Sequence, residues 1–291
     1  MVENRESITA QLCAWVRAWH SNTARQKIYD DYLAYDFMGQ AKYQETERFI
    51  RTLAGETPVA DFVGEYFAPI PLSRVPFTEE RLRKFAEQGG TQYVICGAGQ
   101  DTFSFRNEIG GLQIFEIDHP DTQRFKLDRI RQLEWNIPEN VHFVPVNFER
   151  ERMTGKLLQA GFHPGQKTFF SILGVSYYLT LPVFTETLRQ ISELSALDSV
   201  LVFDYPQRNG DFPPRVEELA KITRDLGEVM PGGFHYNEVS RALYALGFQI
   251  DTFLSPDRVQ KAYFADRHDG IHAFENVNLL SAIYTAGRDY E

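Results

Sequence analysis

A glycine turn flanked by acids is the part of this sequence whose residue types point most directly to chemistry. The turn, Gly97-Ala98-Gly99, follows the apolar run 93–96, and Asp101 comes two residues later. Glycine has no side chain, so the backbone can approach a ligand closely at such a turn. A second apolar run ends in Asp118, 21 residues beyond Gly97 (118 − 97). At this spacing a nucleotide-binding βαβ unit presents a carboxylate to a ribose.

The segments around this turn alternate between strand and helix patterns, which predicts an α/β fold with a mostly parallel, doubly wound sheet. Continuous apolar runs predict buried strands at 93–96, 112–118, 141–147, 167–173, 199–204, 248–254 and 278–286. Helical spacing of apolar residues predicts helices at 7–20, 78–88, 120–134, 153–160, 180–197, 216–226 and 237–246. Three of these helices begin at a capping side chain, namely Ser7, Thr78 and Thr180.

Two stretches near the N-terminus do not fit that alternation. The pattern of residues 23–38 predicts a helix with a break near Asp30-Asp31. The four prolines in residues 55–76 predict mostly irregular structure there. We expect one compact unit, in which residues 1–76 are a helical addition to a Rossmann-like core at 77–291 and residues 206–236 are an insertion in that core.

Polar residues gather where the predicted strands end. In an open α/β sheet, ligands bind outside the carboxyl ends of the strands, so these residues should surround one pocket. They are Gly97, Gly99 and Asp101 after the first strand, Asp118 and His119 after the second, Asn147 and Phe148 after the third, Leu173 to Tyr178 after the fourth, and Asp204 and Tyr205 after the fifth.

A dinucleotide such as NAD fits this set of residues poorly. The dinucleotide fingerprint needs a third glycine at position 102, where this chain has Thr102. It also relies on a helix N-terminus that faces a pyrophosphate. Asp101 would place a negative charge beside that pyrophosphate. An NAD-dependent oxidoreductase is therefore the less favoured interpretation.

S-adenosyl-L-methionine fits the same residues better, because it carries a ribose, a sulfonium and an ammonium but no phosphate. Asp118 would accept hydrogen bonds from the ribose hydroxyls. Asn147 would accept one from the adenine amino group, and Phe148 would contact the adenine ring.

Several motifs together are similar to those of the leucine carboxyl methyltransferase family, including its bacterial branch. The similarity covers nearly the whole chain and is carried by Ile95–Thr102 with Arg106, Phe115–Pro120, Lys126, Val144–Glu149, Gly174–Thr180, Thr23-Ala24, Tyr29–Asp31, Gly232–Phe234 and Leu246–Phe248. The resemblance implies a class I methyltransferase fold, with a seven-stranded, mostly parallel sheet and an antiparallel last strand. The branch includes enzymes that methylate carboxylates of polyketide-type natural products.

The resemblance also implies a role for Arg74, as the arginine that pairs with the cofactor's methionine carboxylate. A guanidinium can bind a carboxylate with two parallel hydrogen bonds. A solvated surface arginine is the alternative. The complete cofactor-binding set that we expect is Arg74, Gly97, Ala98, Gly99, Asp101, Asp118, His119, Asn147, Phe148, Leu173 and Gly174.

Two positions in that set depart from the family pattern. Asn147 stands where the family usually has Asp, and its amide oxygen can still accept a hydrogen bond from adenine. Leu173 stands where the family usually has a Glu that helps to hold the amino-acid end of the cofactor. Leu173 therefore motivates an alternative, a cofactor-binding protein of the same fold that has lost or changed methyl transfer.

The need for a catalytic base depends on the methyl acceptor. A carboxylate is already ionised at pH 7, so it needs only alignment and desolvation, whereas a hydroxyl needs a base. The candidate catalytic residues are His119 and Tyr177; three further histidines, for which structural roles are the more common outcome, are His235, His268 and His272. The aromatic residues Trp15, Trp19, Tyr32, Phe234 and Tyr236 hint at an apolar acceptor, but the sequence does not identify it.

Charge, cysteine content and hydropathy disfavour several other classes of protein. The 291 residues carry a formal net charge of −10, which disfavours binding to nucleic acid. The two cysteines, Cys13 and Cys96, form no metal-binding pattern and no disulfide framework. No apolar run reaches the length of a membrane span, and Met1–Ser7 does not resemble a signal peptide. We expect a cytoplasmic enzyme with a small-molecule acceptor and no metal; the oligomeric state is not predictable.

Overall fold

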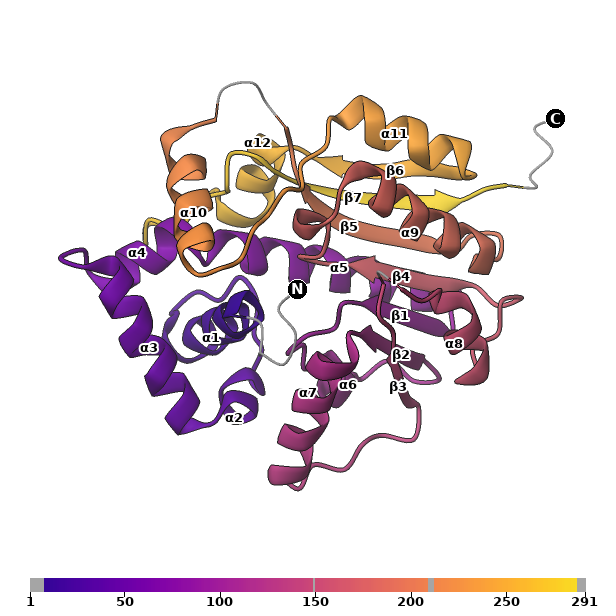
Figure 1. Cartoon of the computed structure of the whole chain (residues 1–291), viewed down its shortest axis with the longest axis horizontal. Coiled ribbons are helices and arrows are strands. Elements are labelled where there is room, and N and C mark those ends of the chain that lie inside the picture. The colour runs from indigo at the N-terminus through magenta and orange to yellow at the C-terminus, as the bar shows by residue number, and fades with distance from the viewer. Residues whose placement is uncertain (1–7, 149, 209–211, 287–291) are drawn as a thin grey trace.

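A mixed β-sheet forms the centre of the computed structural model, which describes residues 8–286 except 149 and 209–211 (Figure 1). Seven strands lie in the described part of the chain, in the spatial order β3-β2-β1-β4-β5-β7-β6. They are β1 Gln92–Cys96, β2 Gln113–Asp118, β3 Val141–Pro145, β4 Thr168–Ile172, β5 Val200–Pro206, β6 Phe248–Leu254 and β7 Val277–Tyr284. The first five pair in parallel, and β7 is antiparallel to both β5 and β6. This confirms the predicted arrangement, a mostly parallel sheet with an antiparallel last strand.

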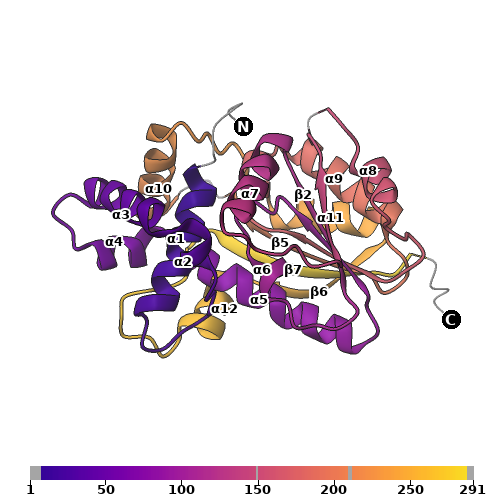
Figure 2. The same ribbon diagram turned by 90° about the horizontal axis from the view of Figure 1, so that it is seen from below.

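Helices cover both faces of the sheet. Helices α5 and α12 lie on one face, and α8, α9 and α11 lie on the other (Figure 2). Helices α1 to α4 lie together beside one end of the sheet. The helices are α1 Ile8–Thr23, α2 Ala34–Met38, α3 Gln40–Ala54, α4 Val59–Tyr66, α5 Pro69–Glu87, α6 Phe103–Arg106, α7 Pro120–Gln132, α8 Met153–Gln159, η1 Ser176–Tyr178, α9 Leu181–Leu194, α10 Pro214–Asp225, α11 Tyr236–Ala245, α12 Pro256–Val259 and the π-helix η2 Gln260–Phe264.

The alternation of side chains along each strand divides the core into two parts. In β1, Tyr93 and Ile95 belong to a cluster with residues of α1 to α5, whereas Val94 and Cys96 belong to a cluster with residues of α8, α9 and α11. Successive residues of a strand point to opposite faces, so a strand covered on both faces must be apolar throughout. This explains why the central strands appear in the sequence as unbroken apolar runs.

The prediction of irregular structure at 55–76 is wrong, because α4 and most of the first half of α5 lie there. Pro69 and Pro71 stand in the first turn of α5, where the missing N–H groups would have no partner within the helix. Pro76 lies inside the helix and is buried. Thr78 is consequently not a cap but a mid-helix residue, whose hydroxyl donates to the Arg74 carbonyl at 2.8 Å.

The helix predicted over 23–38 is also largely wrong. Residues 24–33 are not helical, and the short α2 follows them. Asp31 is completely buried there, and its backbone N–H donates to the Ser21 hydroxyl at 2.8 Å. Contacts with distant parts of the chain thus override the local helical pattern. Helix α3 was not predicted, and the proposed cap Ser7 lies outside the described residues.

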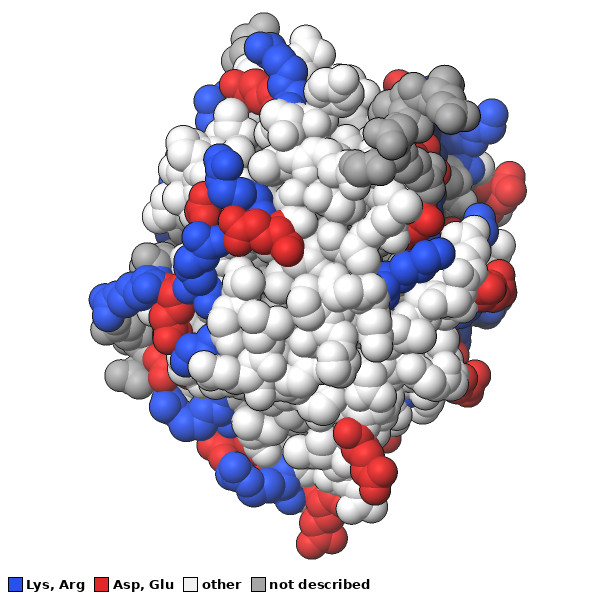
Figure 3. Space-filling view, turned by 90° about the vertical axis from the view of Figure 1, so that its right-hand side faces the viewer, with Lys and Arg blue, Asp and Glu red and all other residues white. Residues whose placement is uncertain are grey.

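The molecular face at the right of Figure 1 carries acidic and basic side chains close together around its margin, with an uncharged centre (Figure 3). On this face, charges of one sign do not gather into a continuous patch. None of the helices among residues 8–286 that the structure describes has the length and apolar character needed to cross a membrane.

Candidate functional site

A cavity of about 1270 Å³ lies where the parallel strands end. Its wall includes residues that follow β1, β2, β3, β4 and β5, as expected for an open α/β sheet. The structure brings every predicted site residue to this wall: Arg74, Gly97, Ala98, Gly99, Asp101, Asp118, His119, Asn147, Phe148, Leu173, Gly174 and Tyr177.

The glycine turn after β1 has a conformation that requires glycine. Gly97 has a φ of 78°, and a Cβ at this position would lie 2.4 Å from the Val175 side chain. Its N–H donates to the Ile117 carbonyl at 2.8 Å, and the N–H of Gly99 donates to the Asp118 carboxylate. The backbone of this turn, which carries no side chain at Gly97 and Gly99, therefore lies directly beside Asp118 at the end of β2.

Asp118, His119 and Asn147 lie side by side. The Asp118 carboxylate also accepts from the His119 N–H at 2.7 Å, and burial raises the pKa of this carboxyl. His119 caps α7, where its Nδ1 accepts from the Asp121 N–H at 3.3 Å. Its Nε2 lies 3.5 Å from the Asn147 side-chain nitrogen. Both ring nitrogens thus have polar neighbours at this end of the cavity.

The helix that follows the glycine turn has only one turn. In this segment, the Asp101 carboxylate accepts from the Phe103 N–H at 2.7 Å. Burial alone would raise the pKa of Asp101, but Arg106 and Arg17 outweigh burial and lower it. The turn is therefore flanked by two acids, Asp101 and Asp118, and lacks the long helix that would face a pyrophosphate. This donor set fits a ligand with a ribose and a positive charge better than a dinucleotide.

Arg74 reaches the cavity from α5 and is not a solvated surface residue. Only 13% of its side chain is exposed, and its Nη1 lies 3.2 Å from the Asp204 carboxylate. Its Nη2 lies 3.6 Å from the Cys13 sulfur. The guanidinium also packs against Gly174, where a Cβ would come within 2.6 Å of it.

Asp204 was expected near the pocket from the sequence but was given no role there; it lies within β5, two residues before that strand ends. It is completely buried and accepts from the Tyr177 hydroxyl at 2.9 Å and from the Gly174 N–H at 2.7 Å. Burial raises the pKa of Tyr177 well above its ordinary value, and the adjacent carboxylate adds to that effect. The sequence signal for its role was that Asp204 directly follows an apolar run, as Asp118 does.

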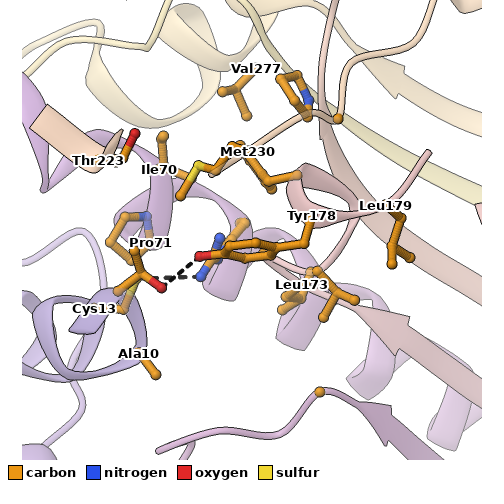
Figure 4. Close-up of a pocket in the computed structure, with 18 of the residues that line it drawn as sticks. Ala10, Cys13, Ile70, Pro71, Leu173, Tyr178, Leu179, Thr223, Met230 and Val277 are labelled. Carbon is orange, nitrogen blue, oxygen red and sulfur yellow. Dashed lines mark hydrogen bonds between the residues drawn. The ribbon is translucent and has the colours of Figure 1, made fainter. Parts of the chain in front are cut away.

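The other half of the cavity is an apolar chamber between α1, α5, η1 and α10 (Figure 4). We use this name for the space lined by Ile70, Val216, Leu219, Met230, Phe274 and Val277. Tyr178 extends across it from η1 toward α1, and its hydroxyl lies 2.7 Å from the Thr9 hydroxyl. The N-terminal helices and the 206–236 segment both contribute to the wall.

The aromatic residues that were expected to surround an acceptor lie elsewhere. Trp15 is buried in the core and stacks on Trp19, and Phe234 is buried against Phe184. Tyr236 packs on Phe253, and Tyr32 is 59% exposed. The aromatic side chains in the cavity wall are instead Tyr66, Phe67, Phe148, Tyr177, Tyr178, Phe212 and Phe274.

Helix α10 is anchored at its first turn by Arg215. This buried guanidinium donates to the backbone carbonyl of Glu65 and, at 3.0 Å, to that of Ala273. It also lies over the Phe274 ring, with its Cζ 4.5 Å from the ring centroid. Past the helix, the Gly232 N–H donates to the Tyr177 carbonyl at 2.8 Å. The segment that roofs the chamber is therefore attached at both ends.

Comparisons with known proteins give one consistent answer. The family model described as "Leucine carboxyl methyltransferase" matches residues 10–192. A Bacillus subtilis protein named "Putative S-adenosyl-L-methionine-dependent methyltransferase YktD" is 33% identical, over 97% of this chain and 99% of that protein. Another of the same description, Franean1_4929 from Parafrankia sp., is 30% identical, over 75% of this chain and 67% of its own length.

Solved structures share the fold. The crystal structure of a "putative methyltransferase" from Thermobifida fusca has a TM-score of 0.62 and 13% sequence identity, over 98% of this chain and 97% of that one. A DUF574 family protein from Streptomyces avermitilis has a TM-score of 0.59 and 13% identity, over 97% and 99% of the two chains. At this level of identity, the likeness concerns the fold alone.

Proposed function

Because this chain belongs to the leucine carboxyl methyltransferase family, we propose that it transfers the methyl group of S-adenosyl-L-methionine to the carboxylate of an apolar, polyketide-type small molecule. One observation carries the proposal. A single cavity joins the acid-flanked glycine turn to an apolar chamber whose described wall contains no histidine.

The polar half of the cavity suits the cofactor. Asp118 would accept hydrogen bonds from the ribose hydroxyls, and Asn147 and Phe148 would bind adenine; all three line the cavity. Arg74 would hold the carboxylate of the amino-acid end. When bound, S-adenosyl-L-methionine supplies an electrophilic methyl group on a sulfonium. The protein's part is then to exclude water and to align the acceptor oxygen with that methyl group.

No histidine borders the chamber among the residues that the structure describes, and this supports a carboxylate as the acceptor. Among the described residues of the cavity wall, the one histidine is His119, and it lies beside Asp118 and Asn147. The Tyr177 hydroxyl donates to the buried Asp204. We therefore propose that both residues position groups and that neither removes a proton from the acceptor. A carboxylate acceptor fits this arrangement, because it is already ionised at neutral pH.

The proposed environment of the enzyme follows from its chemistry. Both cysteines, Cys13 and Cys96, are free thiols, as is usual in a reducing compartment. We place the enzyme in the cytoplasm, with a small-molecule acceptor and without nucleic acid or membrane as a partner.

Calorimetry with S-adenosylhomocysteine, the demethylated product, tests cofactor binding. We expect binding by the unaltered protein and a loss of about 100-fold in affinity for Asp118→Ala, because a buried acceptor of two ribose hydrogen bonds is removed. Asp128→Ala is the matched control and should bind normally, because this side chain on α7 is half-exposed and does not belong to the cavity wall. If the unaltered protein shows no binding at millimolar ligand, the proposed cofactor is wrong.

The acceptor class is tested with methyl-labelled cofactor and a panel of apolar carboxylic acids and phenols. A methyl ester releases labelled methanol on mild alkaline treatment, whereas a methyl ether does not. We expect label in the alkali-labile product only. Alkali-stable label would assign hydroxyl methylation instead. Binding of cofactor without transfer to any acid of the panel would favour a protein that has lost or changed its reaction.

A further inference from the structure

Asp204 is a fully buried carboxylate to which the family motifs assign no role. It accepts hydrogen bonds from Arg74 at 3.2 Å, from the Tyr177 hydroxyl at 2.9 Å and from the Gly174 N–H at 2.7 Å. All three donors belong to the cavity wall. We propose that Asp204 is a positioning residue, which holds these three groups as one unit that receives the amino-acid end of the methyl donor.

Three separate elements converge on this carboxylate. Arg74 comes from α5, Tyr177 from η1 and Gly174 from the turn after β4, while Asp204 itself lies in β5. The Ser176 hydroxyl adds a fourth contact, because it donates to the Asp204 carbonyl at 2.7 Å. A carboxylate removed from water persists only where such partners replace its hydration. The charge of Asp204 therefore fixes the mutual positions of these elements.

The arginine in this unit has a defined direction and spare donors. Its guanidinium lies between Asp204 and Cys13, against the backbone of Gly174, which has no side chain in the way. A guanidinium has about five N–H donors in a rigid fork, and one contact with Asp204 leaves others for a ligand carboxylate. Without Asp204, Arg74 would keep its charge but lose this orientation.

The charge of the unit also suits a zwitterion. Leu173, directly after β4, brings no charge to the cavity, so the negative charge nearest to Arg74 is that of Asp204 on the neighbouring strand. The pair is neutral as a whole. An amino-acid end with one carboxylate and one ammonium can replace its hydration there without leaving a net charge buried.

This inference rests on the proposed function, and the test keeps the two apart. We would measure binding of two ligands by calorimetry: S-adenosylhomocysteine, and methylthioadenosine, which has the same nucleoside and thioether but no amino-acid end. Asp204→Asn should lower the affinity for S-adenosylhomocysteine by about tenfold or more, because it disturbs a charge-assisted contact. The affinity for methylthioadenosine should change by less than about twofold. If the role of Asp204 were merely structural, Asp204→Asn would lower the affinity for both ligands to a similar extent.

A double-mutant cycle shows whether Asp204 acts through Arg74. In an Arg74→Met background, Asp204→Asn should have no further effect on S-adenosylhomocysteine, because the group that it positions is gone. If Asp204→Asn does not fold, Tyr177→Phe tests the same inference. We expect this variant to lose about threefold in affinity for S-adenosylhomocysteine and none for methylthioadenosine. Equal losses for both ligands, or no loss, would overturn the inference. If the unaltered protein binds neither ligand, the proposed function has failed instead.

Discussion

Arg17 in α1 donates a hydrogen bond from Nη2 to the backbone oxygen of Gln100, at 2.6 Å. A helix near the start of the chain thus holds the glycine turn directly. The Nε of Arg17 lies 2.8 Å from Asp31, whose other oxygen accepts from the Thr102 hydroxyl at 2.6 Å. Arg106 continues this buried network to Glu79 on α5. The N-terminal helices and the turn are therefore one polar assembly.

Arg17→Met should destabilise the protein strongly, because Asp31 is fully buried and would lose the nearer of its two cationic partners, the other being Arg106 at 3.6 Å. Breaking a buried ion pair from one side typically costs about 3 kcal/mol or more. Urea unfolding should show that loss in the free energy of unfolding. Arg51→Met is the matched control: its partner Glu47 is exposed, so the change should stay below about 0.5 kcal/mol. Similar losses in both variants would contradict the assigned network.

Gly174→Ala should displace Arg74. The new methyl group would lie 2.6 Å from one guanidinium nitrogen and 2.7 Å from the other, and this flexible end can move more easily than the backbone. We expect about a tenfold loss of affinity for S-adenosylhomocysteine, with methylthioadenosine little affected. Gly111→Ala, at a similar φ of 75° but with open space around it, shares the backbone strain of about 1 kcal/mol. Its ligand affinity should remain that of the unaltered protein.

Cys13 should react with thiol reagents when the cavity is empty. Both cysteines border the cavity, but Cys13 is partly exposed, whereas Cys96 is buried at the end of β1, where burial raises its pKa to about 12. Mass spectrometry should therefore find one alkylated cysteine, Cys13, and saturating S-adenosylhomocysteine should slow its modification. Cys13→Ser should abolish the labelling. Modification of Cys96 at a similar rate would show that the strand opens or that the cavity is placed differently.

His20 should make the protein less stable in acid. It is fully buried, and its Nε2 accepts from the Ile28 N–H at 2.9 Å. Burial, aided by the charge of Arg267, lowers its pKa from 6.5 to about 4. The unfolded chain therefore takes up the proton first, so the contribution is complete above pH 6.5 and decreases as the pH falls toward 4.

The expected loss from His20 is about 3 kcal/mol of the free energy of unfolding, since each pKa unit corresponds to about 1.4 kcal/mol. Urea unfolding at a series of pH values measures it. His20→Gln provides an acceptor that does not titrate, so this variant should lack the step between pH 6.5 and 4. An identical pH profile for both proteins would exclude His20 as its cause.

The sheet and the family were predictable because the relevant signals are local. Each central strand is buried on both faces and appears as an apolar run, and the motif resemblance agrees with the family model. Most of the residues at the strand ends were correctly predicted to surround one pocket, because parallel strands end at one edge. Ser176, Asp204 and Tyr205 are exceptions, because they are completely buried and do not belong to the cavity wall.

What the sequence did not reveal depends on distant contacts. Residues 24–33 have helical composition, but the buried Asp31 holds them in another conformation through Arg17 and Thr102. The prolines of 55–76 indicated a loop, because the sequence does not show that two of them occupy the first turn of a helix. The position of Asp204 behind Arg74 joins residues 130 apart in the chain, and no local pattern encodes it.

The attachment of the 206–236 segment suggests how relatives of this protein could diverge. The segment begins at Gln207, which pairs with Phe234 in an isolated bridge. It ends near Gly232, where a Cβ atom would lie only 2.3 Å from the Ser176 carbonyl oxygen. Mutations between these two points can reshape the apolar chamber while the glycine turn, Asp118 and Arg74 keep their places. Under the proposed function, acceptor preference can therefore evolve separately from use of the methyl donor, so that one ancestral scaffold can give rise to enzymes for chemically different acceptors.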